Sequence, residues 1–164
     1  MPASGPPPGR CLLYTSYGIY AYDLTVSDGE VTATGGTASA VYTGGHAESY
    51  DIYAYDITIS GGTVTAEGGT ASTTGTGYAE SFGIFAYNIT ISGGTINADG
   101  GTASAAVSKS YACSYGIYAR DVTVSDGEVT ATGGTASAVY TGGHAESYGI
   151  YAYDLTVSDR KSVV

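Results

Sequence analysis

The sequence repeats itself. A unit of about 33 residues, SYGIYAYDLTVSDGEVTATGGTASAVYTGGHAE in its first copy, begins at Ser16 and recurs along most of the chain. It restarts at Ser49, Ser81, Ser114 and Ser147, so consecutive copies lie 33, 32, 33 and 33 residues apart. A single copy of this length cannot bury its apolar side alone, and neighbouring copies have to stack to share one core. The repeat therefore predicts a solenoid or another stacked array.

Within each copy, apolar and polar residues alternate in three short runs. In the first copy the runs cover residues 18–22, 24–27 and 31–34. A period of two with β-branched and aromatic residues is typical of strands that place one side on a core and the other in solvent. A DG and a GG dipeptide mark turns, because Gly adopts positive φ without steric cost. Residues 37–48 are expected to form a longer loop.

The expected fold is all-β: a right-handed parallel β-helix (β-solenoid) of about four and a half coils, with three short strands in each coil. A β-propeller fits less well, because its blades need about 40 residues and four strands. A leucine-rich repeat is excluded by the shortage of Leu. The sequence has no helix-period stripe and no apolar stretch of the length that a membrane span needs.

The repeat accounts for residues 16–159 and stops abruptly at both ends. Residues 1–15 are expected to be a non-native or disordered leader, and residues 160–164 a non-native tail. The segments 11–16 and 159–164 resemble translated sequencing-adapter DNA, each at the point where the repeat fails. Our hypothesis is that the chain is a fragment of a longer protein, whose further coils would be its neighbours.

The charge of the chain limits its partners. Only 12% of residues are charged and the net charge is −10, so the surface repels phosphate backbones and disfavours nucleic acid. Cations and neutral glycans are better partners. The two cysteines, Cys11 and Cys113, do not have the spacing of a metal or redox motif.

In-register stacking turns each position of the repeat into a column. Two aromatic columns are predicted on one outward face, and flat rings with polar tips suit sugar rings and their hydroxyls. The alternative is that stacked aromatic residues only stabilise the sheet. The candidate carbohydrate-binding residues are Tyr20, Tyr53, Phe85, Tyr118 and Tyr151, together with Tyr22, Tyr55, Tyr87 and Tyr153, and Arg120 interrupts the second column between Tyr87 and Tyr153.

A third column is acidic, and like charges on adjacent strands repel one another. Either turn N–H groups donate to these carboxylates, or a cation such as Ca²⁺ binds several of their oxygens. Calcium is thus a possible cofactor, and no other cofactor is predicted. The column consists of Asp23, Asp56, Asn88, Asp121 and Asp154, of which the four Asp residues are the candidate metal ligands.

His46 and His144 occupy the same position of the repeat. Ala79 and Ala112, or their neighbours, are taken as the equivalent residues of the middle copies. On that alignment a site built on the two histidines would join distant coils, and both are expected to be solvated loop residues.

The segment IYAYDITISGGTVTAEGGTA (residues 52–71), with its variants in the other copies, resembles repeats of bacterial carbohydrate-binding-domain-containing proteins. These are similar to members of the pectate-lyase-like parallel β-helix superfamily. The resemblance covers residues 16–159. It implies an extracellular or cell-surface location, polysaccharide binding and, in some relatives, bound Ca²⁺. It carries no binding residue over to a particular position of this chain.

Three functions follow from these observations. The first is a non-catalytic secreted or cell-surface module that binds polysaccharide through the outward Tyr columns. The second is a passive stalk or adhesin segment, in which the repeats supply length. The third is a polysaccharide lyase with Arg120 as its base. A single Arg among near-identical copies argues against catalysis, so the chain is not expected to be an enzyme.

Overall fold

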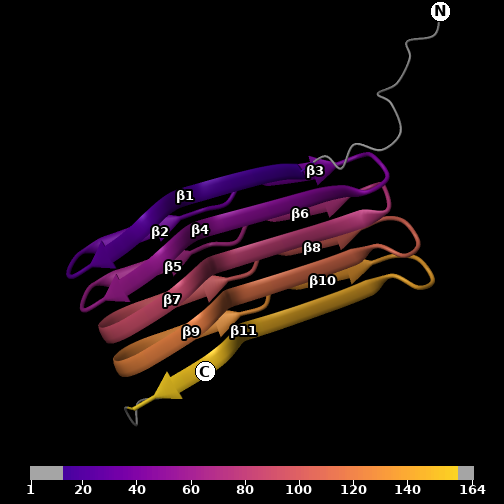
Figure 1. Ribbon diagram of the computed structural model, residues 1–164. Coiled ribbons are helices and arrows are strands. Elements are labelled where there is room, and N and C mark those ends of the chain that lie inside the picture. The colour runs from indigo at the N-terminus through magenta and orange to yellow at the C-terminus, as the bar shows by residue number, and fades with distance from the viewer. Residues whose placement is uncertain (1–12, 159–164) are drawn as a thin grey trace, which may run out of the picture.

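The structure, a computed structural model, describes residues 13–158 and forms a parallel β-solenoid in which successive copies of the repeat lie one above another (Figure 1). The predicted fold class is confirmed. No helix in residues 13–158 is long and apolar enough to cross a membrane. Of the predicted leader (1–15), residues 1–12 lie outside this description, as does the predicted tail (160–164). Residues 13–15 belong to strand β1 and pair in register with residues 46–48.

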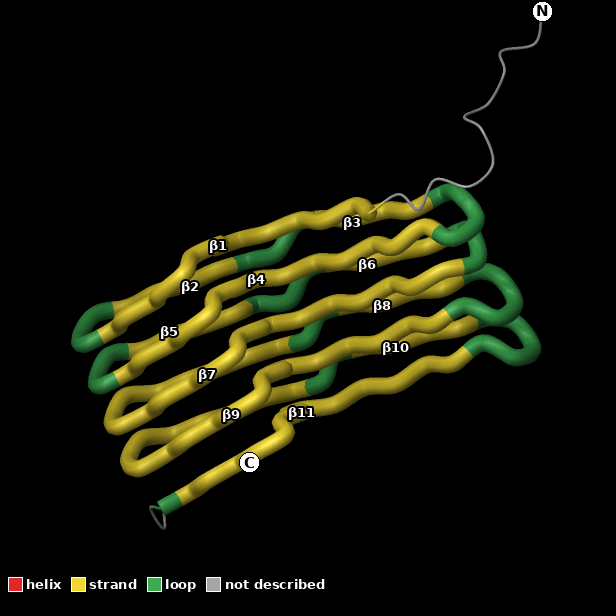
Figure 2. Tube along the Cα trace, in the orientation of Figure 1, coloured by secondary structure: helices red, strands yellow, loops and turns green. Residues whose placement is uncertain are grey.

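Each coil starts with a long strand that runs from one end of the coil to the other and bends along the way (Figure 2). The long strands are β1 (Leu13–Val26), β4 (Gly45–Ile59), β7 (Gly77–Asp99), β9 (Tyr111–Thr132) and β11 (His144–Val157). The chain then turns back through β2 (Glu30–Ala33) and β5 (Thr63–Ala66), or through the second halves of β7 and β9. A short strand closes the coil: β3 (Thr37–Ala40), β6 (Thr70–Thr73), β8 (Thr102–Ala105) and β10 (Thr135–Ala138).

The strand boundaries differ from the prediction in two places. The first two predicted runs, 18–22 and 24–27, belong to one continuous strand, β1, up to Val26. The predicted loop 37–48 instead contains β3 and the start of β4, and only residues 41–44 connect them. The sequence TASA hides its period of two, because Ala and Ser differ little in hydrophobicity. The third run, 31–34, corresponds to β2.

The register aligns the copies as the repeat predicts. All strand pairs are parallel, and Ser16 pairs with Ser49, which in turn pairs with Ser81. The copy from Ser49 to Ser81 is one residue shorter than the others. The missing residue falls in the connection between strands, because residues 74–76 stand where the previous coil has residues 41–44. Equivalent positions therefore form straight columns through the solenoid.

Two kinds of core fill the interior. Between the outgoing part of each long strand and the returning segments, Ile and Val side chains pack in columns. These include Ile52, Ile84 and Ile117, all fully buried. Beneath the short strands the core consists of Ala, with Ala47 and Ala79 also fully buried. Because Ala fills little space, the two layers can lie closer at this end.

Hydrogen bonds between Ser and Gly join the two layers inside the coil. Ser49 Oγ donates to the Gly36 carbonyl oxygen at 2.9 Å, and Ser81, Ser114 and Ser147 make the equivalent bond to Gly69, Gly101 and Gly134. A Cβ atom added at Gly69 would clash with Ser49 Oγ. The GG dipeptide is thus required by the close approach of this buried serine as well as by the turn.

Candidate functional site

The two predicted aromatic columns lie side by side on the outer face of the long strands. In the middle column (Tyr20, Tyr53, Phe85, Tyr118 and Tyr151), the ring centroids of successive coils are 5.0 or 5.1 Å apart and the ring planes lie within 8° of parallel. The outer column (Tyr22, Tyr55, Tyr87, Arg120 and Tyr153) begins with the same stacking, at 5.1 and 4.9 Å. The structure thus brings together all nine residues that the sequence suggested for carbohydrate binding.

A third aromatic column, which the sequence analysis missed, lies on the other side of the middle column. We call it the inner column: Tyr17, Tyr50, Phe82, Tyr115 and Tyr148, stacked at 4.8 to 5.5 Å. Tyr50 and Phe82 are only 6% and 4% exposed. The signal was present, because each copy has an aromatic residue three positions before the middle column, a spacing that breaks the period of two.

The inner and middle columns pack as a herringbone. Rings of the two columns are nearly perpendicular, at 88° for Tyr50 and Tyr53 and 86° for Phe82 and Phe85. Stacked rings whose centroids are 5.1 Å apart need about 3.5 Å between their planes to avoid a clash. This requires each ring normal to lie within roughly 45° of the column axis. Rings of the two columns can then be perpendicular to one another only if they tilt from that axis by roughly 45° in opposite directions. Each ring therefore covers its stacked neighbour only in part.

A groove of about 570 Å³ separates the middle column from the outer column. Ala54 and Ala86 lie between the two rows of rings, and the lining is mainly apolar. The groove runs along the solenoid axis across several coils, since its lining side chains come from β4, β7, β9 and β11: Tyr53, Tyr55, Phe85, Tyr87, Tyr118, Arg120 and Tyr153.

Arg120 replaces a ring in the outer column. Its guanidinium carbon lies 4.8 Å from the centroid of the Tyr87 ring, a cation–π contact, and its Nε atom lies 3.8 Å from Asp121 Oδ2. The side chain is 56% exposed, so the ion pair is screened by water. The other Lys or Arg of residues 13–158 is Lys109, in the loop between β8 and β9.

A glutamate column borders the inner column: Glu48, Glu80, Cys113 and Glu146, in register. The Tyr50 hydroxyl donates to Glu48 Oε2 at 2.9 Å, and the Tyr148 hydroxyl donates to Glu146 Oε2 at 3.2 Å. Burial, with the charge of Glu48 as a second cause, raises the pKa of Glu80 to about 7. Burial also raises the pKa of the Cys113 thiol, which takes the place of a Glu in this column.

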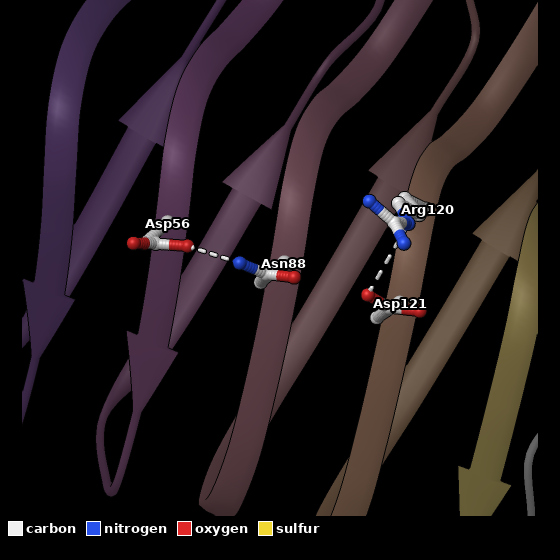
Figure 3. Close-up of polar contacts among 4 residues, drawn as sticks. All are labelled: Asp56, Asn88, Arg120 and Asp121. Atoms are coloured by element: carbon white, nitrogen blue, oxygen red, sulfur yellow. Dashed lines mark hydrogen bonds and ion pairs between the residues drawn. The ribbon is translucent and has the colours of Figure 1, made fainter.

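The predicted aspartate column borders the outer column on its other side. Asn88 Nδ2 donates to Asp56 Oδ1 at 2.6 Å, and Arg120 approaches Asp121 (Figure 3). These side-chain contacts offset part of the repulsion between carboxylates. A second groove of about 500 Å³ follows the column, lined by Asp23, Asp56, Asn88 and Asp121 together with Thr side chains.

Calcium binding at the aspartate column stays a prediction. Within residues 13–158, His, Cys, Asp and Glu side chains do not gather in groups of three or more that could hold a metal ion. The column offers neighbouring carboxylates one coil apart, and Asn88 and Arg120 already occupy Asp56 and Asp121. The residues thus fit a Ca²⁺ site poorly, because this ion prefers six to eight oxygen ligands.

The prediction that the two histidines are loop residues is wrong, because His46 and His144 lie in strands β4 and β11. Their in-register neighbours are Tyr78 and Tyr111, each one residue before the alanine taken as equivalent. The four rings form a fourth stacked column, with centroids 4.7 to 5.1 Å apart. The misalignment arose because the shortened connection 74–76 shifts every later residue of that copy by one position.

One comparison with known proteins gives a match. A family model described as a beta helix repeat matches residues 24–40, 57–84 and 89–107. No curated protein and no solved structure matches the chain. The matched segments contain strands from the first three coils and thus agree with the stacked, parallel arrangement of the solenoid.

Proposed function

From the premise that the chain is a parallel β-helix with beta helix repeats, we propose that it is a non-catalytic module of a secreted or cell-surface protein. Its ligand is a polysaccharide that lies along the groove between the middle and outer columns. The observation that carries the proposal is this groove of about 570 Å³, lined by rings from successive coils.

The chemistry of the groove suits a sugar polymer. A Tyr ring offers an apolar face for the C–H groups of a sugar and a hydroxyl for its polar groups. Tyr55 and Tyr153 on the outer wall are 42% and 77% exposed, and equivalent groups recur from coil to coil. A repeated surface supports a repeated ligand better than it supports a single small molecule. The net charge of −10 disfavours phosphate-rich polymers.

Two observations favour a non-catalytic role. Catalysis needs a unique set of groups with a positioned acid or base, whereas this face presents nearly the same groups in every coil. Arg120 is the exception, and its guanidinium is engaged by the Tyr87 ring and the Asp121 carboxylate.

The second candidate is a passive stalk or adhesin segment. The burial of Tyr50, Phe82 and Tyr115 in the inner column supports it, because these rings stabilise the solenoid whether or not a ligand is present. Under this alternative, the middle and outer columns would only extend the same packing.

Pull-down on insoluble polysaccharides and affinity electrophoresis in soluble ones separate the candidates. The variant Tyr55→Ala/Tyr87→Ala/Tyr153→Ala is expected to lose binding by tenfold or more, since each stacked sugar contact contributes about 1 kcal/mol. The matched control is Tyr42→Ala/Tyr140→Ala, which removes exposed Tyr side chains from loops outside the groove. This control should bind like the unmodified chain.

Absence of binding to every polysaccharide would leave the stalk as the function. Release of unsaturated oligosaccharides that stops in Arg120→Ala would instead establish a lyase.

A further inference from the structure

Carboxylates flank the aromatic columns on both sides. The glutamate column lies beside the inner column, and the aspartate column lies beside the outer column, so the groove runs between two acidic borders. The acidic members within the described residues are Glu48, Glu80, Glu146, Asp23, Asp56, Asp121 and Asp154. Arg120 is the one Lys or Arg side chain among the described residues of these columns. The face therefore combines an apolar groove with a strong negative potential.

The two grooves are neighbours. Tyr55 lines the apolar groove and the next residue, Asp56, lines the acidic one, with the same relation at Tyr87 and Asn88. The outer column is thus the wall between them. Substituents of a polymer in the apolar groove that point across this wall reach the carboxylates of the aspartate column.

From this arrangement we infer that the groove binds a polysaccharide whose sugars carry protonated amino groups. The inference rests on the proposed function and specifies its ligand. The sugar rings lie against the tilted Tyr rings, and the ammonium groups lie over the wall beside Asp23, Asp56 and Asp154. Acidic polysaccharides are repelled, and neutral ones gain only the ring contacts.

Three physical effects favour an amine over a neutral substituent. An ammonium group donates charge-assisted hydrogen bonds to carboxylates. It also interacts favourably with Tyr ring faces, as Arg120 already does with Tyr87 at 4.8 Å. In addition, it offsets the repulsion between like charges stacked one coil apart.

The test compares two probes of equal length: a β-1,4-linked glucosamine hexasaccharide and its fully N-acetylated counterpart. Calorimetry at low salt and about pH 6 measures the two affinities. The amine probe is expected to bind about tenfold more tightly, since several exposed ion pairs each contribute modestly. The advantage should shrink as NaCl is added, because salt screens exposed charges.

A charge-removing variant assigns the preference to the aspartate column. In Asp23→Asn/Asp56→Asn/Asp154→Asn the two probes should bind with nearly equal affinity, and Asn88 shows that the column accepts this side chain. The matched control, Glu30→Gln/Glu128→Gln, removes carboxylates from the returning strands and should keep the preference. Arg120→Tyr, which restores the residue of the other copies, should strengthen binding of the amine probe.

The outcomes separate the two levels of the proposal. Binding of the N-acetylated probe with equal or greater affinity would overturn the amine preference and leave polysaccharide binding intact. Failure of both probes, with no other polysaccharide bound, would remove the proposed function as well. If polylysine binds as tightly as the amine probe and Tyr55→Ala does not weaken it, the face recognises basic peptides and the inference is wrong.

Discussion

The inner and outer columns both consist mainly of Tyr at the same spacing, yet they differ in what surrounds them. Tyr50 in the inner column is 6% exposed, packs edge-on against Tyr53 and Phe85, and donates a hydrogen bond to Glu48. Tyr55 in the outer column is 42% exposed and stacks only on the rings above and below it. A stacked column becomes part of the core when columns flank it on both sides, and it stays available to a ligand when one side is a groove.

The strongest test of this contrast is truncation of one ring in each column. Tyr50→Ala should lower the free energy of unfolding by about 4 kcal/mol, because it empties a buried aromatic site. Tyr55→Ala should cost about 1 kcal/mol, the value of an exposed ring contact. Urea unfolding followed by circular dichroism measures both. Equal losses would mean that the two columns contribute alike to stability.

A change of pH sharpens the contrast, because buried carboxylates lie near the inner column. Asp51 is fully buried and accepts hydrogen bonds from the backbone N–H groups of Gly35 and Gly68. Burial is the largest cause that raises the pKa of Asp51 to about 7. The unfolded chain therefore releases this proton at lower pH than the folded chain does, and stability falls as pH rises from about 4 to 7.

The four other copies have Gly at the position of Asp51. We expect Asp51→Gly to reduce the loss of unfolding free energy between pH 4 and 7 by about 3 kcal/mol. Urea unfolding at pH values across the window measures the slope. Glu80→Gln is the matched variant, because the pKa of Glu80 is also raised to about 7. A slope unchanged in both variants would show that neither carboxylate is the source.

Removal of a single hydroxyl tests the hydrogen bond of the inner column. Tyr50→Phe should cost about 1 kcal/mol, because the bond from the hydroxyl to Glu48 is lost while the ring remains. Phe82, at the same position of the next coil, shows that the site accepts Phe. Tyr148→Phe removes the equivalent bond to Glu146 at an exposed position and should cost less than half as much. Equal costs would contradict the role of burial.

The smallest effect is expected where the outer column already varies. Arg120→Tyr exchanges a cation–π contact with Tyr87 for a ring stack of similar strength, so stability should change by less than about 0.5 kcal/mol. Thermal unfolding measures the shift. A loss above about 1 kcal/mol would indicate that Arg120 has a structural role beyond this contact.

The repeat made the solenoid and its register predictable, because near-identical copies can share a core only when equivalent residues stack. The middle and outer columns and the aspartate column followed directly from that register. The strand β3 did not, since the Ala and Ser of TASA give almost no contrast between inside and outside. The inner column was missed because Tyr17 and Tyr20 are three residues apart, and period-two alternation breaks at the bend between them.

The contacts of individual carboxylates also could not be predicted from the sequence. The aspartate column was identified from spacing, but the hydrogen bond from Asn88 to Asp56 depends on the conformations of the two side chains. Asp51 was overlooked because it stands where the other copies have Gly, a position that pattern analysis assigns to a turn. Its burial arises only when the amides of Gly35 and Gly68 converge on one carboxylate.

In-register stacking has a consequence for how such a surface can evolve. Every added copy extends the groove by one more pair of rings without disturbing the pairs already present. Unequal recombination between near-identical repeats would therefore change the valency of the surface in whole steps. For a polymer ligand, each step adds contacts at a high effective concentration, so avidity rises without any improvement in a single contact. Copy number, more than point mutation, would set the strength of binding.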